Sequence, residues 1–573
     1  MYVQQLTPVA SSLGWSALVA VLPLATLFVL LGALRVRAWL TSLIGLAVAL
    51  VIAVVVYAMP VAQAVLAGTE GAVFGFFPIL WIVINALWIY QMTVRSGHFD
   101  VLRRSFGSVS DDPRVQAVII AFAFGALLEA LAGFGTPVAI CTIMLIALRF
   151  TPLKAAVVAL VANTAPVAFG AIAVPITTLA SVTGLPEADL AAVVGRQTPI
   201  LSVFVPLVLV ALVDGRRGLR ETWGVALVGG LVFGVAQFAV ANAGPVALTD
   251  IVAALLSAGA VVALVRVRPP RRSALHAAAR ETVAAGAGGG GPDTDTDTPD
   301  GPHGPTGRTG SDDPDGPGTD VDAGGPDSRR DVVLAYLPYV IVIVLFSVQQ
   351  IPVVSDALDA VTLKFRWPGL DVRSPTGAPV STTSFTLNWA AAAGTILLVA
   401  GLLTMIALRV RPRDGLAAYG QTLHQLRTAI VTVMAVLALA YVMNLSGQTL
   451  TLGRLLAGAG GFVAVLSPVL GWLGTAVTGS DTSANSLFGS LQVTAARGTG
   501  LDPLLLAAAN SSGGVLGKMI SPQNLAIAAA AVGMGGREGE IFRRVLPWSL
   551  VFLVGMCVLV GLQSTPVLGW MVP

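Results

Sequence analysis

The sequence predicts an all-α polytopic membrane protein, built as an inverted-topology repeat of two halves with broken helices or re-entrant hairpins at the midplane. Hydrophobic residues make up 55% of the 573-residue chain and charged residues 11%, and the mean hydropathy is +0.83. A soluble protein carries about 25% charged residues. Apolar runs of about 20 residues, each sufficient for one crossing, recur along the chain. Polar, glycine-rich runs interrupt some of them at matching positions in the two halves.

The first half, residues 1–272, begins with apolar runs near 14–34, 38–58 and 72–94. The N-terminal segment lacks the basic region of a signal peptide, so the first run is expected to remain as a span. Basic residues mark the cytoplasmic side of a membrane. They follow the first and third runs, at Arg35, Arg37, Arg95, Arg103 and Arg104. The N-terminus is therefore predicted to lie outside.

Later basic patches agree with this orientation, because the chain must cross an even number of times between them. The patches are Arg216–Arg220, Arg266–Arg272, Arg409–Arg413 and Arg537–Arg544. Paired spans are expected at 223–243 with 251–266 and at 332–350 with 388–408. A last span at 545–563 places the C-terminus outside.

Two connections differ in composition from the spans. Residues 273–330 are Gly, Pro and Asp with almost nothing apolar, so they are predicted to form a disordered acidic cytoplasmic linker. The linker separates the N-terminal repeat from the C-terminal repeat, residues 331–573. Residues 352–387 form an outer loop with a strand-like stretch, for which we expect a small ordered lid or hairpin.

One offset of 347 residues relates the two halves. It aligns Asn163 with Asn510, Gly170 with Gly517 and Pro175 with Pro522, and it places Phe134 on Asp481. The halves enter the membrane from opposite sides. This is the pattern of an inverted repeat with interrupted segments at corresponding positions.

The short apolar segments on either side of each first interruption indicate a re-entrant hairpin or one broken helix. They are 114–132 with 137–149 and 460–477 with 482–493. A helix that begins inside the membrane presents free N–H groups and the positive end of its dipole. Two such ends brought together at the midplane suit a small anion.

Lys518 is one of three lysines against thirty arginines, and it stands within a polar interruption between 502–517 and 524–535. Its ammonium group could bind a substrate carboxylate or pair with Asp481. It could instead lie at the membrane edge and extend to the headgroups.

Asp481 and Glu129 are the candidate proton-coupling groups, since loss of water favours the neutral acid. Asp481 could also act as the N-cap of a helix that starts at Thr482. Glu129 could also be a structural carboxylate in a salt bridge.

The predicted substrate-binding residues can donate to a carboxylate or hydroxyl, or equally satisfy the interrupted backbone. They are Gly133, Gly135, Thr136, Asn163, Thr164, Ser480, Asp481, Thr482, Ser483, Asn485, Asn510, Ser511, Ser512, Lys518 and Gln523.

Four motifs make the sequence similar to the L-lactate permease family. They are LLEALAGFGTPVAI (127–140), NTAPVAFGAIAVP (163–175), TGSDTSANSLFGSLQ (478–492) and AANSSGGVLGKMISPQNLAIA (508–528). The resemblance covers most of 14–266 and 331–563. It implies a secondary transporter of the cytoplasmic membrane that carries lactate, and often glycolate or related 2-hydroxy acids, with protons.

The leading hypothesis is therefore a proton-coupled symporter for small monocarboxylates that works by alternating access. A sodium-coupled carrier with backbone ligands near Ser480 and Ser512 is an alternative. A membrane-embedded enzyme or a channel has less support, because the chain contains no Ser/His/Asp, HExxH or Walker pattern and no recurring filter motif. No cofactor, metal site or nucleic-acid partner is expected. The two cysteines, Cys141 and Cys557, are expected to be buried hydrophobes, and the oligomeric state is not predicted.

Overall fold

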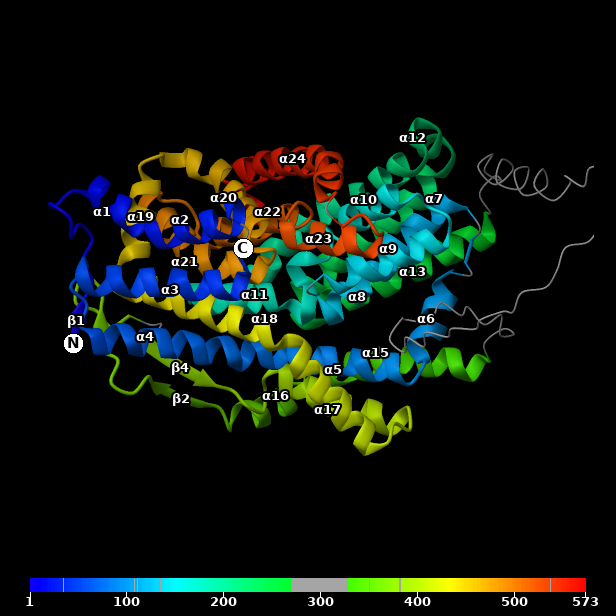
Figure 1. Ribbon diagram of the computed structural model, residues 1–573, viewed down its shortest axis with the longest axis horizontal. Coiled ribbons are helices and arrows are strands. Elements are labelled where there is room, and N and C mark those ends of the chain that lie inside the picture. The colour runs from blue at the N-terminus through cyan, green and yellow to red at the C-terminus, as the bar shows by residue number, and fades with distance from the viewer. Residues whose placement is uncertain are drawn as a thin grey trace, which may run out of the picture.

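The computed structural model describes residues 1–268 and 328–573, apart from residues 35, 108, 111, 134, 350, 381–382 and 536. Nearly all of the expected linker, and Phe134, therefore lie outside the described residues. Within the described ranges, ten helices are long and apolar enough to cross a membrane. This confirms the all-α polytopic class, and Figure 1 shows helices filling most of the molecule.

The first half contains thirteen labelled α-helices, three of which continue through π-helical turns at Val29–Ala33, Gly75–Leu80 and Ala117–Phe124 (η3). They are α1 (Leu13–Ala20), α2 (Leu22–Phe28), α3 (Ala38–Val55), α4 (Val61–Phe74), α5 (Trp81–Arg95), α6 (His98–Gly107), α7 (Pro113–Gln116), α8 (Gly125–Ala132), α9 (Thr136–Ala147), α10 (Pro152–Ala162), α11 (Gly170–Thr183), α12 (Glu187–Ala243) and α13 (Thr249–Val267).

The second half contains ten labelled α-helices. Its helices are α15 (Arg329–Gln349), α16 (Pro352–Asp359), α17 (Ala393–Ala407), α18 (Pro412–Ser446), α19 (Gln448–Ala457), α20 (Val463–Thr478), α21 (Asp481–Thr499), α22 (Pro503–Lys518), α23 (Pro522–Ala531) and α24 (Glu538–Gln563).

The structure contains two membrane-spanning segments that the sequence analysis did not predict. α18 is 35 residues long, and its N-terminal half carries Arg413, Asp414 and Arg427, which lowers the local hydropathy. α12 is a helical hairpin that folds back at Asp214 and Gly215, where the backbone leaves helical geometry. Its first arm was not expected, although the second matches the expected span at 223–243.

The loop between α16 and α17 contains the expected ordered hairpin. Strand β2 (Leu363–Arg366) pairs antiparallel with β4 (Ser384–Leu387). The N-terminal strand β1 (Tyr2–Val3) pairs in parallel with β3 (Val372–Arg373), so the N-terminus and this loop lie at the same end of the molecule (Figure 1).

The interruptions take two forms. α9 runs back along η3 and α8, since the Cys141 thiol donates to the carbonyl of Ile120 at 3.3 Å. α21 runs back along α20, since Gln492 donates to the carbonyl of Ser467 at 3.1 Å. Both are therefore helical hairpins. By contrast, α10 and α11 form one span bent by 64° around residues 163–166.

Close backbone contact holds α22 against α20. A Cβ atom added at Gly513 would lie 2.1 Å from the carbonyl oxygen of Pro468, and one at Gly471 would lie 1.8 Å from that of Asn510. Small residues allow helix backbones to approach in this way within membranes. The hairpin α20–α21 is thereby fixed against the helix that carries Lys518.

Gly513→Ala should destabilise the protein by about 1–3 kcal/mol or more, because the methyl group has no room against backbone atoms. Thermal unfolding in detergent, followed by size-exclusion chromatography, measures this. The matched control is Gly555→Ala, where an added Cβ meets nothing within 4 Å. Equal stability of the two variants would contradict the close packing.

Candidate functional site

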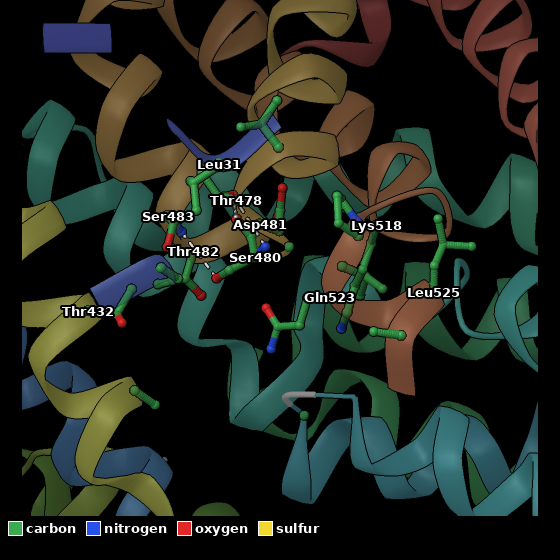
Figure 2. Close-up of a pocket in the computed structure, with 18 of the residues that line it drawn as sticks. Leu31, Thr432, Thr478, Ser480, Asp481, Thr482, Ser483, Lys518, Gln523 and Leu525 are labelled. Carbon is green, nitrogen blue, oxygen red and sulfur yellow. Dashed lines mark hydrogen bonds between the residues drawn. The ribbon is translucent and has the colours of Figure 1, made fainter. Parts of the chain in front are cut away.

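A cavity of about 1190 Å³ borders all four helix interruptions. It is lined by Gly133 at the first, by Gly170, Ala171, Val174 and Pro175 at the second, by Thr478–Ser483 at the third, and by Lys518, Ile520, Pro522 and Gln523 at the fourth. Figure 2 shows Gln523 between the segment carrying Ser480 and Asp481 and the helix end carrying Lys518. The interruptions from both halves therefore meet at one site.

Lys518 and Glu129 form a buried ion pair in the wall of this cavity. The Nζ atom of Lys518 contacts Oε1 of Glu129, and their side chains are 8% and 3% exposed. Asn163 donates to the other carboxylate oxygen of Glu129 at 3.0 Å. The alternative pairing of Lys518 with Asp481 is wrong in this structure, and so is a position at the membrane edge. The salt-bridged reading of Glu129 is confirmed.

The helix end that carries Lys518 is fixed by its own backbone. The carbonyl oxygen of Lys518 accepts hydrogen bonds from Ser521 Oγ and Asn524 Nδ2, both at 3.0 Å. Ser521 is also the N-cap of α23. These bonds satisfy groups that a helix leaves open when it stops inside a membrane. The position of the ammonium group is therefore set by the bend.

Asp481 is the first residue of α21, and Ser480 is its N-cap, which corrects the expectation that Asp481 caps a helix starting at Thr482. The carboxylate accepts from Ser511 at 2.6 Å, Asn485 at 3.3 Å and Thr475 at 3.4 Å. All three donors are neutral, and the side chain is 3% exposed. Asp481 is thus a buried carboxyl group without a paired cation among the described residues.

A network of buried amides extends from Asp481 into both halves. Asn485 donates to the carbonyl of Pro175 at 3.1 Å and accepts from Asn510 at 2.9 Å. Gln492 donates to Asn510 Oδ1 at 3.2 Å. Asn485 and Asn510 therefore connect the hairpin α20–α21 with the second interruption, and neither lines the cavity.

The predicted site residues divide into two groups. Those that line the cavity are Glu129, Gly133, Ser480, Asp481, Thr482, Ser483, Lys518 and Gln523. Those that do not line it are Gly135, Thr136, Asn163, Thr164, Asn485, Asn510, Ser511 and Ser512. Of the second group, Asn163, Asn485 and Ser511 hold the carboxylates in place. Gly135 has φ of 82° and lies against α23, where a Cβ would meet Ile527 at 2.4 Å.

Sequence reasoning missed the left-handed turn at the second interruption. Ala171, Ile172 and Ala173 have φ angles of 46°, 60° and 59°. This conformation costs non-glycine residues about 1–2 kcal/mol each, so the surrounding packing must impose it. Alanine and isoleucine give no signal for such a turn. Ala171 lines the cavity next to the first interruption, since a Cβ at Gly133 would contact its side chain at 3.3 Å.

The cavity is also lined by the connection between α2 and α3 together with the start of α3, and by the start of α24. Arg37 and Trp39 belong to the first segment, and Glu538 and Phe542 to the second. Thr428 and Thr432 of α18 add hydroxyl groups. Two cations, three carboxylates, several hydroxyls and an amide therefore line a space large enough for a small organic anion and water.

Comparison with known proteins agrees with this geometry. A family model described as L-lactate permease matches residues 16–567. The chain is 39% identical to an L-lactate permease of Bacillus subtilis (strain 168) over the full length of both proteins. It is 38% identical to the glycolate permease GlcA of Escherichia coli (strain K12), with 98% of each chain covered.

Among solved structures, the chain is similar to the Alcanivorax borkumensis YdaH transporter at 16% identity and a TM-score of 0.42, over 96% of this chain and 97% of the other. The relatives are named as permeases rather than enzymes. Because the family model spans nearly the whole chain, this protein belongs to the L-lactate permease family of multi-pass membrane transport proteins.

Proposed function

We propose that the protein is a secondary active symporter that carries L-lactate, and related small 2-hydroxy monocarboxylates such as glycolate, together with protons across the cytoplasmic membrane. The substrate class follows the names of its relatives. The observation that carries the proposal is the Lys518–Glu129 ion pair in the wall of a cavity bordered by all four interruptions.

The substrate carboxylate binds at Lys518 and at the first turn of α23, where Gln523 faces the cavity. The helix N-terminus and the ammonium group both favour an anion there. The 2-hydroxyl group exchanges hydrogen bonds with Ser480 or Thr482 on the opposite wall.

Coupling follows from competition for one cation. When the substrate carboxylate takes Lys518, Glu129 loses its partner and becomes a buried unpaired charge, which is costly in a site of low dielectric. Uptake of one proton by Glu129 removes that cost. The net charge of the loaded site then equals that of the empty site, so lactate and H⁺ move together without net charge. Asp481 is the second candidate proton site.

The cavity opens toward the cytoplasm in this conformation. Its lining includes residues 36–39, Glu538, Gly539 and Phe542, which are neighbours in the sequence of Arg537, Arg543 and Arg544. Basic residues favour the cytoplasmic side. Alternating access then requires closure between α3, α18 and α24 and opening on the opposite side.

The inverted repeat and the orientation belong to the same proposal. Residues 1–272 and 331–573 form the two repeats, the linker over 273–330 is cytoplasmic, and both termini lie outside. The matching order of hairpin and interrupted span in the two halves supports the repeat. The pairing of β1 with β3 supports an outer location for the N-terminus together with loop 352–387.

Sodium coupling is the second candidate function. Asp481 accepts hydrogen bonds only from neutral donors among the described residues, and the buried hydroxyl of Ser512 has no hydrogen-bond partner among them. A small cation near these oxygens would be balanced by the carboxylate.

Proteoliposomes that contain the protein should accumulate labelled L-lactate when a proton gradient is imposed, acidic on the side of substrate addition. A sodium gradient alone should drive no accumulation. Uptake driven only by sodium would transfer coupling to the Asp481–Ser512 region, and no uptake under either gradient would exclude lactate as the substrate.

Lys518→Ala should abolish uptake while the protein still inserts, because the substrate carboxylate then loses the cation that binds it. Lys364→Ala is the matched control, since Lys364 is exposed on β2 and should be dispensable. Near-normal uptake by the Lys518 variant, measured at equal protein content in the same vesicles, would remove the ammonium group from substrate binding.

Measuring the free energy of unfolding of variants can distinguish a structural role of the Lys518–Glu129 ion pair from a role in transport. Removing either partner alone should cost about 3–5 kcal/mol, because the other charge stays buried without a partner. The double variant Glu129→Gln/Lys518→Gln should recover most of that stability in thermal unfolding and still fail to accumulate lactate. A double variant that transports normally would show that the pair serves the fold alone.

A further inference from the structure

Another buried carboxyl group, which does not line the cavity, lies on α13. Asp250 is 1% exposed and stands in the first turn of the helix. Its Oδ1 atom accepts a hydrogen bond from Gln237 Nε2 at 2.9 Å. Its Oδ2 atom has no hydrogen-bond partner among the described residues. The proposed transport mechanism does not use this group.

Three hydrogen bonds, together with the backbone between Ala165 and Asn163, connect Asp250 with the ion pair. Gln237, on the second arm of α12, also donates to the carbonyl of Ala165 at 3.3 Å. Two residues earlier, Asn163 donates to Glu129. The helix that carries Glu129, α8, packs directly against α13, so the two carboxyl groups lie on neighbouring helices. A change in the charge of either carboxyl group is therefore felt by the other.

The charged groups on the elements around α13 leave Asp250 without a counterion. α8 contributes Glu129, and η3 and α11 contribute no charged residue. On α12, Arg196 binds Asn242 and the carbonyl of Met571, and Glu187 accepts from Thr177. The other charged residues of α12 are Asp189 and the group Asp214–Glu221 around the fold of its hairpin. No ion pair joins Asp250 to any described residue.

The buried surroundings of Asp250 therefore determine whether its carboxyl group is neutral or ionised. A helix N-terminus favours an anion only weakly, whereas a buried charge without a counterion carries a much larger penalty. The neighbouring negative charge of Glu129 adds to that penalty. Neutral Asp250 fits these surroundings while Glu129 is ionised and paired with Lys518.

We propose that Asp250 is a second proton-binding residue of the transport site, linked to Glu129 through Gln237 and the interruption at residues 163–166. The inference rests on the proposed proton symport. Asp250 holds a proton while Glu129 is ionised and paired with Lys518. When the substrate takes Lys518, Asp250 passes its proton to Glu129 and then takes up another proton from water, so the loaded site still gains one proton in all.

Asp250→Asn tests this, since the amide copies the neutral acid in shape and cannot ionise. Lactate counterflow at equal pH on both sides should stay within about twofold of the wild type, whereas pH-gradient-driven accumulation should fall about tenfold and lose its dependence on pH. Asp359→Asn, at the exposed end of α16, is the matched control and should alter neither assay.

Wild-type values in both assays for Asp250→Asn would overturn the proposal, as would equal loss of both in a well-folded variant.

If this variant does not fold, carbodiimide labelling of the wild-type protein tests the proposal instead. Dicyclohexylcarbodiimide reacts with protonated buried carboxyl groups, and mass spectrometry should find Asp250 modified, less so as pH rises. No labelling at any pH would refute a proton on Asp250. Absence of lactate transport by the wild type would reject the proposed function and leave the labelling result standing.

Discussion

A polypeptide that stops a helix inside a membrane must supply partners for the backbone groups that the helix leaves open, because lipid offers none. Here four interruptions share that requirement by meeting at one place. Ser480 and Ser521 cap α21 and α23, Asn524 binds the carbonyl of Lys518, and Asn485 binds the carbonyl of Pro175. The cavity exists because these segments satisfy one another and leave a space lined by their remaining polar groups.

The charged residues are distributed differently in the two halves, although the order of helices is similar. The cation comes from the second half and its carboxylate partner from the first. A buried ion pair gives little net stability, because desolvation offsets the attraction. Its position, with one partner from each half, is the reason for our proposal that it takes part in transport. One cation shared between a fixed carboxylate and a mobile one is a simple means of linking proton binding to substrate binding.

Close packing between helices outside the cavity holds the helices that carry the site residues in place. Gly471 and Gly513 bring α20 and α22 into backbone contact, and the two arms of α12 meet in the same way at Gly230 and Gly234. The fold of the α12 hairpin is held by Arg114, which is buried and paired with Asp112, Asp214 and Glu221. These contacts make rigid units of the helices that carry Lys518 and Gln237.

The sequence by itself determined the membrane class, the positions of the interruptions and the residues with unusual chemistry, because hydropathy and the placement of Lys518, Glu129 and Asp481 are local properties. It also located the hairpin within residues 352–387. It did not reveal the first arm of α12 or the span within α18, where charged residues dilute the apolar signal.

Only the tertiary structure decided which charges meet. The partner of Lys518 is Glu129, 389 residues away, and not Asp481, which is nearer in sequence and equally plausible by composition. It also decided that Ser480 and not Asp481 caps α21, that residues 171–173 turn left-handed, and that Asn485 and Asn510 lie behind the cavity. These outcomes depend on how helices from the two halves pack against each other. Local sequence patterns carry no signal for that packing.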